Sequence, residues 1–121
     1  MTLMKTLYAY GLKPILFRIH PDHVHDWFVA LGEFSGRFAL SRAIVSALYE
    51  YKGKDISKVV DGIKYESPVL LSAGFDGNGR LTRILRHMSF GGEEIGSTTA
   101  KYCEGNPRPR MTRLIRNKSL I

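Results

Sequence analysis

The chain has 121 residues, 44% of them hydrophobic, which allows one modest core and predicts at most one small domain or part of a larger one. Eighteen lysines and arginines against 11 acidic residues give a formal net charge of +7, which favours anionic partners such as nucleic acid, anionic lipid or phosphorylated ligands. The single cysteine, Cys103, excludes an intrachain disulfide and favours a reducing compartment, and no apolar run is long enough to predict a membrane-spanning helix.

The first part of the chain is predicted to be helical. Residues 3–8 carry apolar side chains at helical spacing, and we expect this short amphipathic helix to break at Gly11 and Pro14. A second helix is expected from Pro21, because proline suits a first helical turn, and a third over residues 39–51. The apolar face of the second helix comprises Val24, Trp27, Phe28 and Leu31.

The second part changes to strand-like patterns. An Asp61-Gly62 turn predicts a small hairpin, followed by a buried strand over residues 69–72. A helix is expected over residues 80–88, with Leu81, Ile84 and Leu85 facing inward, and a second strand ending at residues 97–99. The order strand, loop, helix, strand is typical of a right-handed parallel βαβ unit. Two parallel strands cannot cover both faces of a sheet, so we expect the fold to be incomplete within this chain.

The glycine-rich loop in SPVLLSAGFDGNGRL, residues 67–81, follows the first of these two strands. In parallel α/β folds, ligands bind at the carboxyl ends of strands, where small residues let a cofactor approach the backbone. The loop lacks the Gly-Lys-Ser/Thr of a nucleotide-binding P-loop and does not match the GxGxxG dinucleotide pattern. Glycine spacing alone therefore leaves two alternatives, a ligand loop and a simple chain reversal.

Three segments together resemble one family. SPVLLSAGFDGNG and FGGEEIGSTTAKYCEGNPRPRMTRL are similar to NPVGLAAGFDKNG and GFGFVEIGTVTPxPxxGNPxPRLFRL of quinone-linked dihydroorotate dehydrogenase. LFRIHPDHVHDW is similar to the LFxLDPExAHE helix of the membrane-associated class. The resemblance implies an α/β protein with a helical, membrane-associating quinone subdomain over residues 1–52. Residues 53–121 would be the start of an FMN-binding (β/α)8 TIM barrel, which needs about 250 residues when complete.

This resemblance implies a flavoprotein oxidoreductase of de novo pyrimidine biosynthesis. FMN would accept a hydride from dihydroorotate, forming orotate, and pass electrons to a membrane quinone at the cytoplasmic face of a bacterial-type inner membrane. By position, His25 and Arg113 would line the quinone tunnel. The positions that would contact the flavin are Ala73, Gly74, Phe75, Asp76, Gly77 and Ser97. The catalytic base would lie beyond Ile121, so we expect the chain alone to be inactive.

The sequence departs from the family pattern at several positions. Gly77 stands where the family has a lysine that contacts flavin and orotate, and glycine supplies neither charge nor reach. Gly92 and Glu93 replace an aromatic and an apolar residue, and the pair Tyr102-Cys103 alters a proline-rich turn.

Peripheral membrane attachment is expected through the apolar side chains of the first two helices. The same surface could instead pack on a barrel. The residues concerned are Leu3, Leu7, Ile15, Leu16, Phe17, Trp27 and Phe28, with Lys5, Lys13 and Arg18 beside them.

The sequence also raises two other functions, nucleic-acid binding and metal binding, and allows His25 and Arg113 to be ordinary surface residues. The basic segment 101–118 could belong to a nucleic-acid-binding module, but it has no accompanying DNA- or RNA-binding motif, so no nucleic-acid partner is expected. His20, His23 and His25 could suggest a metal site, but only the first two could share a helix face, so no metal is expected. Without the family pattern, His25 would be an ordinary helix-surface histidine and Arg113 a solvated arginine.

Overall fold

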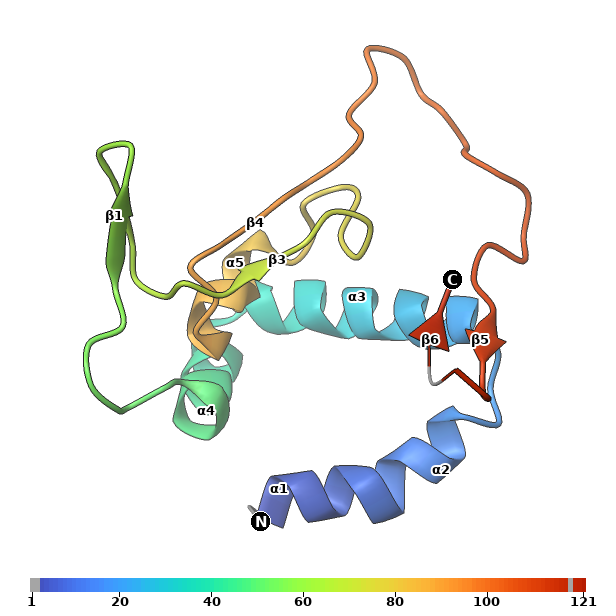
Figure 1. Cartoon of the computed structure of the whole chain (residues 1–121), viewed down its shortest axis with the longest axis horizontal. Helices are drawn as coiled ribbons and strands as arrows, with labels where there is room; N and C mark the ends of the chain where they lie inside the picture. Colours follow the sequence, from blue (N-terminus) through green and yellow to red (C-terminus); the bar gives the residue numbers. More distant parts are fainter. Residues whose placement is uncertain (1–2, 118) are drawn as a thin grey trace. The chain divides into compact units, whose positions relative to one another are not determined.

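The computed structural model describes residues 3–117 and 119–121 (Figure 1). Helices occupy most of the first 49 residues, and short strands follow. The helical elements are α1 (Leu3–Thr6), the π-helix η1 (Leu7–Leu12), α2 (Lys13–Leu16), α3 (Pro21–Arg37), α4 (Ala39–Tyr49), α5 (Thr82–Leu85) and the 3₁₀ helix η2 (Arg86–Met88). The strands are β1 (Lys58–Val60), β2 (Ile63–Tyr65), β3 (Leu70–Leu71), β4 (Gly92–Glu93), β5 (Arg113–Leu114) and β6 (Ser119–Leu120).

The expected helix break at Gly11 and Pro14 is wrong. The backbone stays helical from α1 to α2 by passing through the π-helix η1, in which the Lys13 N–H donates to the Tyr8 carbonyl five residues earlier. Pro14 lies in the first turn of α2, directly after this π-helical stretch, and the helical backbone continues past it. Proline therefore continues this helical stretch instead of ending it.

The two longer helices confirm the sequence prediction. Helix α3 begins at Pro21, and α4 ends at Tyr49, two residues before the predicted limit. An extended residue, Phe38, separates them with φ −107° and ψ 138°. The Ser41 hydroxyl donates to the Ser35 carbonyl at 2.5 Å, and the Arg42 guanidinium to the next carbonyl at 2.8 Å. These two bonds satisfy carbonyls that the end of α3 leaves without helical partners.

The parallel βαβ unit is also confirmed. Strands β3 and β4 pair in parallel, with Leu70 opposite Gly92 and Leu71 opposite Glu93, and α5 connects them (Figure 1). Two details differ from expectation. Strand β4 ends at Glu93, well before residues 97–99, and β3 is not buried, since Leu70 is 52% exposed. In the part of the chain that the structure describes, no third strand joins this pair.

The core is small and lies between α3 and α5. Its buried side chains include the three predicted to face inward, and all are between 3% and 7% exposed: Val29, Leu81, Ile84 and Leu85. Two glycines on α3 let α5 approach closely. A Cβ at Gly32 would lie 2.4 Å from Leu81 Cδ2, and a Cβ at Gly36 would lie 3.0 Å from Arg83 Cβ. The absence of a side chain at Gly32 and Gly36 therefore lets α5 pack directly on α3.

Two antiparallel hairpins complete the strands. The predicted hairpin β1–β2 turns at Asp61 and Gly62, whose φ angles of 51° and 77° suit the type I′ turn that Asp-Gly favours. The pairing of β5 with β6 was not expected from the sequence.

Contacts divide the chain into two compact units. Unit 1 comprises Met1–Phe28 and Cys103–Ile121, and unit 2 comprises Val29–Tyr102. The predicted domain boundary between residues 52 and 53 concerns the family's subdomains and stays a prediction.

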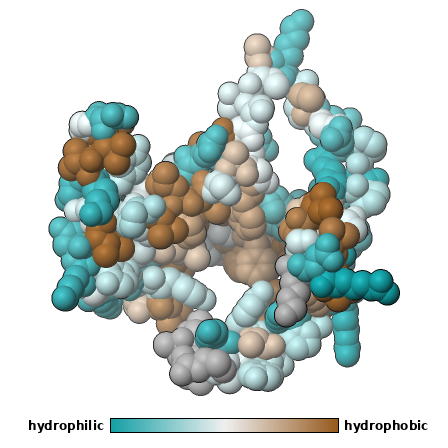
Figure 2. Space-filling model, in the orientation of Figure 1, coloured by the Kyte–Doolittle hydropathy of each residue, from teal (hydrophilic) through white to brown (hydrophobic). Residues whose placement is uncertain are grey.

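Large apolar side chains are exposed in both units (Figure 2). Trp27 in unit 1 and Leu31 in unit 2 are 57% and 60% exposed on α3. None of the described helices is long and apolar enough to cross a membrane.

Candidate functional site

The glycine-rich loop begins at the carboxyl end of β3, as predicted. Gly74 and Gly79 have φ angles of +98° and +69°, in the region that glycine adopts more readily than other residues. Ala73, Gly74 and Gly77 are exposed. Within residues 3–117 and 119–121, the backbone amides of these three residues donate no hydrogen bond to the protein. The loop therefore presents uncovered backbone donors at the strand end.

Asp76 is the exception in this loop because its side chain turns inward. It is 2% exposed, and its Oδ2 accepts a hydrogen bond from the Leu81 N–H at 2.5 Å. Leu81 is the N-cap residue of α5, so the carboxylate ties the loop to the start of that helix. The structure gives Asp76 a positioning role, and its carboxylate faces the protein.

Gly77, which stands where the family has its lysine, has free space around it. A Cβ built there meets no heavy atom within 4 Å, and its φ lies outside the left-handed region. A longer side chain at this position would therefore extend from the loop without a clash.

The segment after β4 lies close to the end of the loop. A Cβ at Gly79 would be 2.9 Å from Ile95 Cδ1, and the Thr82 hydroxyl donates to Glu93 Oε1. Ser97 follows in this segment and is exposed. The parallel pairing thus brings both predicted groups of flavin contacts to the carboxyl end of the same strand pair.

In unit 1, Arg113 holds the end of α2. Its guanidinium donates to the carbonyls of Ile19 at 2.6 Å and Leu16 at 3.2 Å, and lies 4.9 Å from the centroid of the Phe17 ring. The same side chain borders a cavity of about 470 Å³ with a mostly apolar wall. The residues that line it are Lys13, Phe17, Arg113, Leu114, Ile115, Ser119 and Leu120.

His25, the other predicted quinone residue, does not line this cavity. Its Nδ1 lies 3.6 Å from Asp26 Oδ1, and the other oxygen of Asp26 accepts a hydrogen bond from Arg108 at 2.6 Å. The Arg108 guanidinium holds the pKa of Asp26 below its ordinary value. The structure thus keeps His25 and Arg113 in the same unit but does not place them around one cavity.

Sequence reasoning missed a clamp at the start of α3. Asp22 is 4% exposed, and its two carboxylate oxygens accept the backbone N–H groups of Arg110 and Met111, each at 2.9 Å. These hydrogen bonds, the one from Arg110 foremost, lower the pKa of Asp22. The clamp fixes the proline-rich segment that carries Arg108. An aspartate at the start of a helix was visible in the sequence, but its partners lie 88 and 89 positions away.

The expectation that no metal is bound concerns His20, His23 and His25. No cluster of three or more histidine, cysteine or acidic side chains suited to a metal occurs among the described residues.

Comparison with known proteins decides the family. Residues 56–121 match the family model described as dihydroorotate dehydrogenase. The chain belongs to the dihydroorotate dehydrogenase family. This confirms the resemblance found in the sequence.

Similar curated proteins carry the name dihydroorotate dehydrogenase (quinone). The one from Roseiflexus sp. strain RS-1 is 33% identical over 118 residues, which are 98% of this chain and 32% of the relative. Those from Nocardia farcinica and Acidithiobacillus ferrooxidans are each 33% identical, over 95% and 93% of this chain and 31% of each relative. The chain spans about a third of the length of the curated relatives that it matches.

Proposed function

We propose that this chain is part of a quinone-dependent dihydroorotate dehydrogenase, an enzyme that oxidises dihydroorotate to orotate in de novo pyrimidine biosynthesis. The observation that carries the proposal is the parallel strand pair with the Ala73–Gly79 loop at its carboxyl end, inside the segment that matches the family model. FMN, when bound, supplies the hydride acceptor for dihydroorotate and the electron donor for the quinone. The β3–α5–β4 unit would be the first part of a (β/α)8 barrel.

The residues of the loop suit a flavin. Gly74 has no Cβ, so a flat ring could approach its backbone, and the exposed amides of Ala73 and Gly74 are hydrogen-bond donors without a protein partner among residues 3–117 and 119–121. Phe75 and Ser97 would lie beside the ring, and the buried carboxylate of Asp76 would hold the loop in position. Rigid positioning of this kind matters because hydride transfer depends on a near-attack geometry.

Gly77 leaves the loop without a positive charge at the position of the family lysine. Orotate and dihydroorotate are anions, and a lysine at this position would provide an ammonium group that glycine cannot replace. The open space around Gly77 is compatible with a cation supplied from another part of the enzyme.

The quinone would enter beside Arg113. The cavity there combines a guanidinium with the side chains of Phe17, Leu114, Ile115 and Leu120, which suits an apolar ring bearing carbonyl acceptors. Exposed apolar side chains of the first two helices, with Lys13 and Arg18 beside them, would hold this part on the cytoplasmic face of a bacterial-type inner membrane. His25, which lies on α3, would contribute to the quinone site from that helix.

No observation favours the nucleic-acid alternative. Three arginines of the basic C-terminal segment have partners inside unit 1. Arg108 pairs with Asp26, Arg110 donates to the carbonyls of Glu104 and Asn106, and Arg113 donates to carbonyls near α2. These contacts orient the guanidinium groups toward the protein.

A chimera tests the proposal. Residues 1–121 would replace the aligned segment of the Roseiflexus relative, and the purified chimera would be assayed for bound FMN and for dihydroorotate-dependent reduction of a soluble quinone. We expect FMN to be retained, turnover to be measurable, and the 121-residue chain alone to give none. A chimera that melts cooperatively yet retains no FMN would refute the proposal, and the unaltered relative serves as the control.

A further inference from the structure

A second cavity, in unit 2, has an almost entirely basic wall. It measures about 660 Å³, and we call its four arginines, Arg37, Arg42, Arg83 and Arg86, the arginine cluster. Thr82 and His87 complete the lining. None of these residues belongs to the glycine-rich loop or to the cavity beside Arg113. We propose that the arginine cluster binds a phosphate-bearing anion, a function independent of the one proposed above.

The fold itself brings the cluster together. Gly36 lets α5 approach α3 so closely that a Cβ there would lie 3.0 Å from Arg83 Cβ, which places Arg83 beside the end of the helix that carries Arg37. The Arg42 guanidinium is held from α4 by its bond to the Gly36 carbonyl at 2.8 Å. Three separate helical elements thus converge on one cavity.

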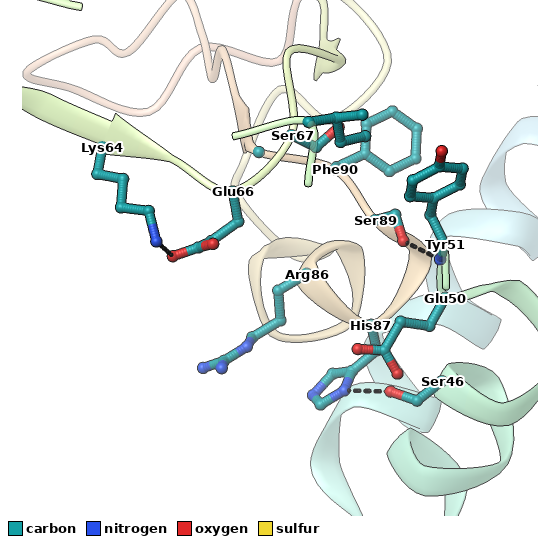
Figure 3. Close-up of a pocket in the computed structure, with 12 residues that line it drawn as sticks. Ser46, Glu50, Tyr51, Lys64, Glu66, Ser67, Arg86, His87, Ser89 and Phe90 are labelled. Atoms are coloured by element: carbon teal, nitrogen blue, oxygen red, sulfur yellow. Dashed lines mark hydrogen bonds and ion pairs between the residues drawn. The ribbon is translucent and has the colours of Figure 1, made fainter. Parts of the chain in front are cut away.

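The remaining side of the cavity is held by η2. The Ser46 hydroxyl and His87 Nδ1 are 2.9 Å apart, which fixes η2 against α4 (Figure 3). Figure 3 shows the Arg86 side chain on the same helical turn as His87, with no interaction drawn to any neighbour. The neighbouring hydrogen bond of His87 fixes the position of this turn, and the Arg86 guanidinium has no hydrogen-bond or ion-pair partner in the part of the chain that the structure describes.

The charges of the cluster are not balanced within the described part of the chain. Glu33 is the carboxylate nearest to it, and it is shared between Arg37 and Arg80, each at 2.5 Å. Those two guanidinium groups, Arg80 foremost, keep the pKa of Glu33 below its ordinary value, so it stays ionised. Among the described residues, the side chains of Arg83 and Arg86 form no ion pair or hydrogen bond. Several positive charges around one cavity repel one another, and a bound anion would relieve that repulsion.

Phosphate is the anion that this arrangement fits best. A guanidinium presents paired N–H donors that match the oxygens of phosphate, and arginine is preferred over lysine where such forked contacts are made. The cavity volume of about 660 Å³ is in the range of small-ligand sites and exceeds what a halide needs. The phosphate could belong to a soluble phosphorylated molecule or to a lipid headgroup, which share this chemistry.

Calorimetry with the 121-residue chain tests the proposal, with pyrophosphate as the soluble probe in about 0.15 M NaCl, where long-range attraction is screened. Co-sedimentation with phosphatidylglycerol-containing vesicles, against pure phosphatidylcholine vesicles, is the lipid arm. Arg83→Gln and Arg86→Gln are the test variants, because neither side chain has a partner to lose. Lys54→Gln, an exposed residue of unit 2, is the matched control for loss of one positive charge. Circular dichroism confirms that each variant stays folded.

We expect each arginine substitution to weaken binding about threefold to tenfold and Lys54→Gln to leave it unchanged. That pattern with pyrophosphate supports a soluble ligand, and the same pattern with vesicles alone supports a lipid headgroup. Equal weakening by all three substitutions would reveal a general charge effect and overturn the proposal. Absence of binding in both arms would overturn it as well.

Discussion

Replacing Gly91 with alanine tests whether the β3–β4 pair holds the candidate flavin loop in place. A Cβ at Gly91 would lie 1.9 Å from the Ser67 carbonyl oxygen, whereas a carbon and an oxygen normally approach no closer than about 3.3 Å. The backbones must separate by more than about 1 Å. This movement strains the hydrogen bond of 2.9 Å from the Gly91 N–H to the Val69 carbonyl, which joins the residues just before β4 and β3.

Two costs add in this variant. Overpacking costs about 1–3 kcal/mol of unfolding free energy, and loss of one backbone hydrogen bond costs about 0.5–1.5 kcal/mol. We therefore expect Gly91→Ala to lower the stability of unit 2 by about 2–4 kcal/mol. With a urea dependence of about 2 kcal/mol per molar, in the middle of the usual range for small proteins, the unfolding midpoint should fall by about 1–2 M.

Gly77→Ala is the matched control, because a Cβ there meets open space. It should leave the midpoint unchanged or raise stability by about 0.4–1 kcal/mol through the unfolded state. Urea titrations followed by circular dichroism compare the two variants. Equal midpoints would refute the steric reasoning and with it the view that close β3–β4 pairing organises the loop.

Further predictions concern both units. Asp22 has a lowered pKa, so its clamp should stabilise unit 1 above about pH 4 and be lost as the pH falls through the lowered value. In the fluorescence of Trp27, the single tryptophan, Asp22→Asn should reduce that dependence and leave the part that comes from Asp26, whose pKa is also lowered. In the chimera, alanine at His25 or Arg113 should slow flavin reoxidation by quinone more than flavin reduction by dihydroorotate, and equal slowing of both would contradict the quinone assignment. The 121-residue chain should float with anionic liposomes at low salt, and a protein that stays at the bottom of the gradient would count against membrane attachment. Gly77→Lys in the chimera should lower the KM for dihydroorotate about tenfold, while Asn78→Lys, with the same charge one position away, should not.

Local signals in the sequence predicted much of the fold. Pro21 and the apolar spacing after it predicted α3, the Asp61-Gly62 pair predicted a hairpin, and alternation of strand and helix patterns predicted the parallel pair. Each of these signals lies in residues close together in the sequence, and over that range residue propensity and hydrophobic periodicity predict secondary structure.

Features that depend on distant partners were not predictable in this way. The Asp22 clamp joins residues 88 and 89 positions apart, and the arginine cluster joins α3 and α4 to residues about 45 positions further along. The burial expected for β3 did not occur, because burial requires neighbours on both faces and not only an apolar strand. Pro14 predicts a helix break because the sequence does not reveal the change to π-helical hydrogen bonding before it.

The most direct test of the central claim is anaerobic mixing of the FMN-loaded chimera with dihydroorotate, followed by a soluble quinone, in a stopped-flow spectrometer. The account predicts that the oxidised flavin absorbance falls after the first addition and returns after the second. A chimera that holds FMN and melts cooperatively, but whose flavin absorbance dihydroorotate leaves unchanged even with Gly77→Lys, would contradict it.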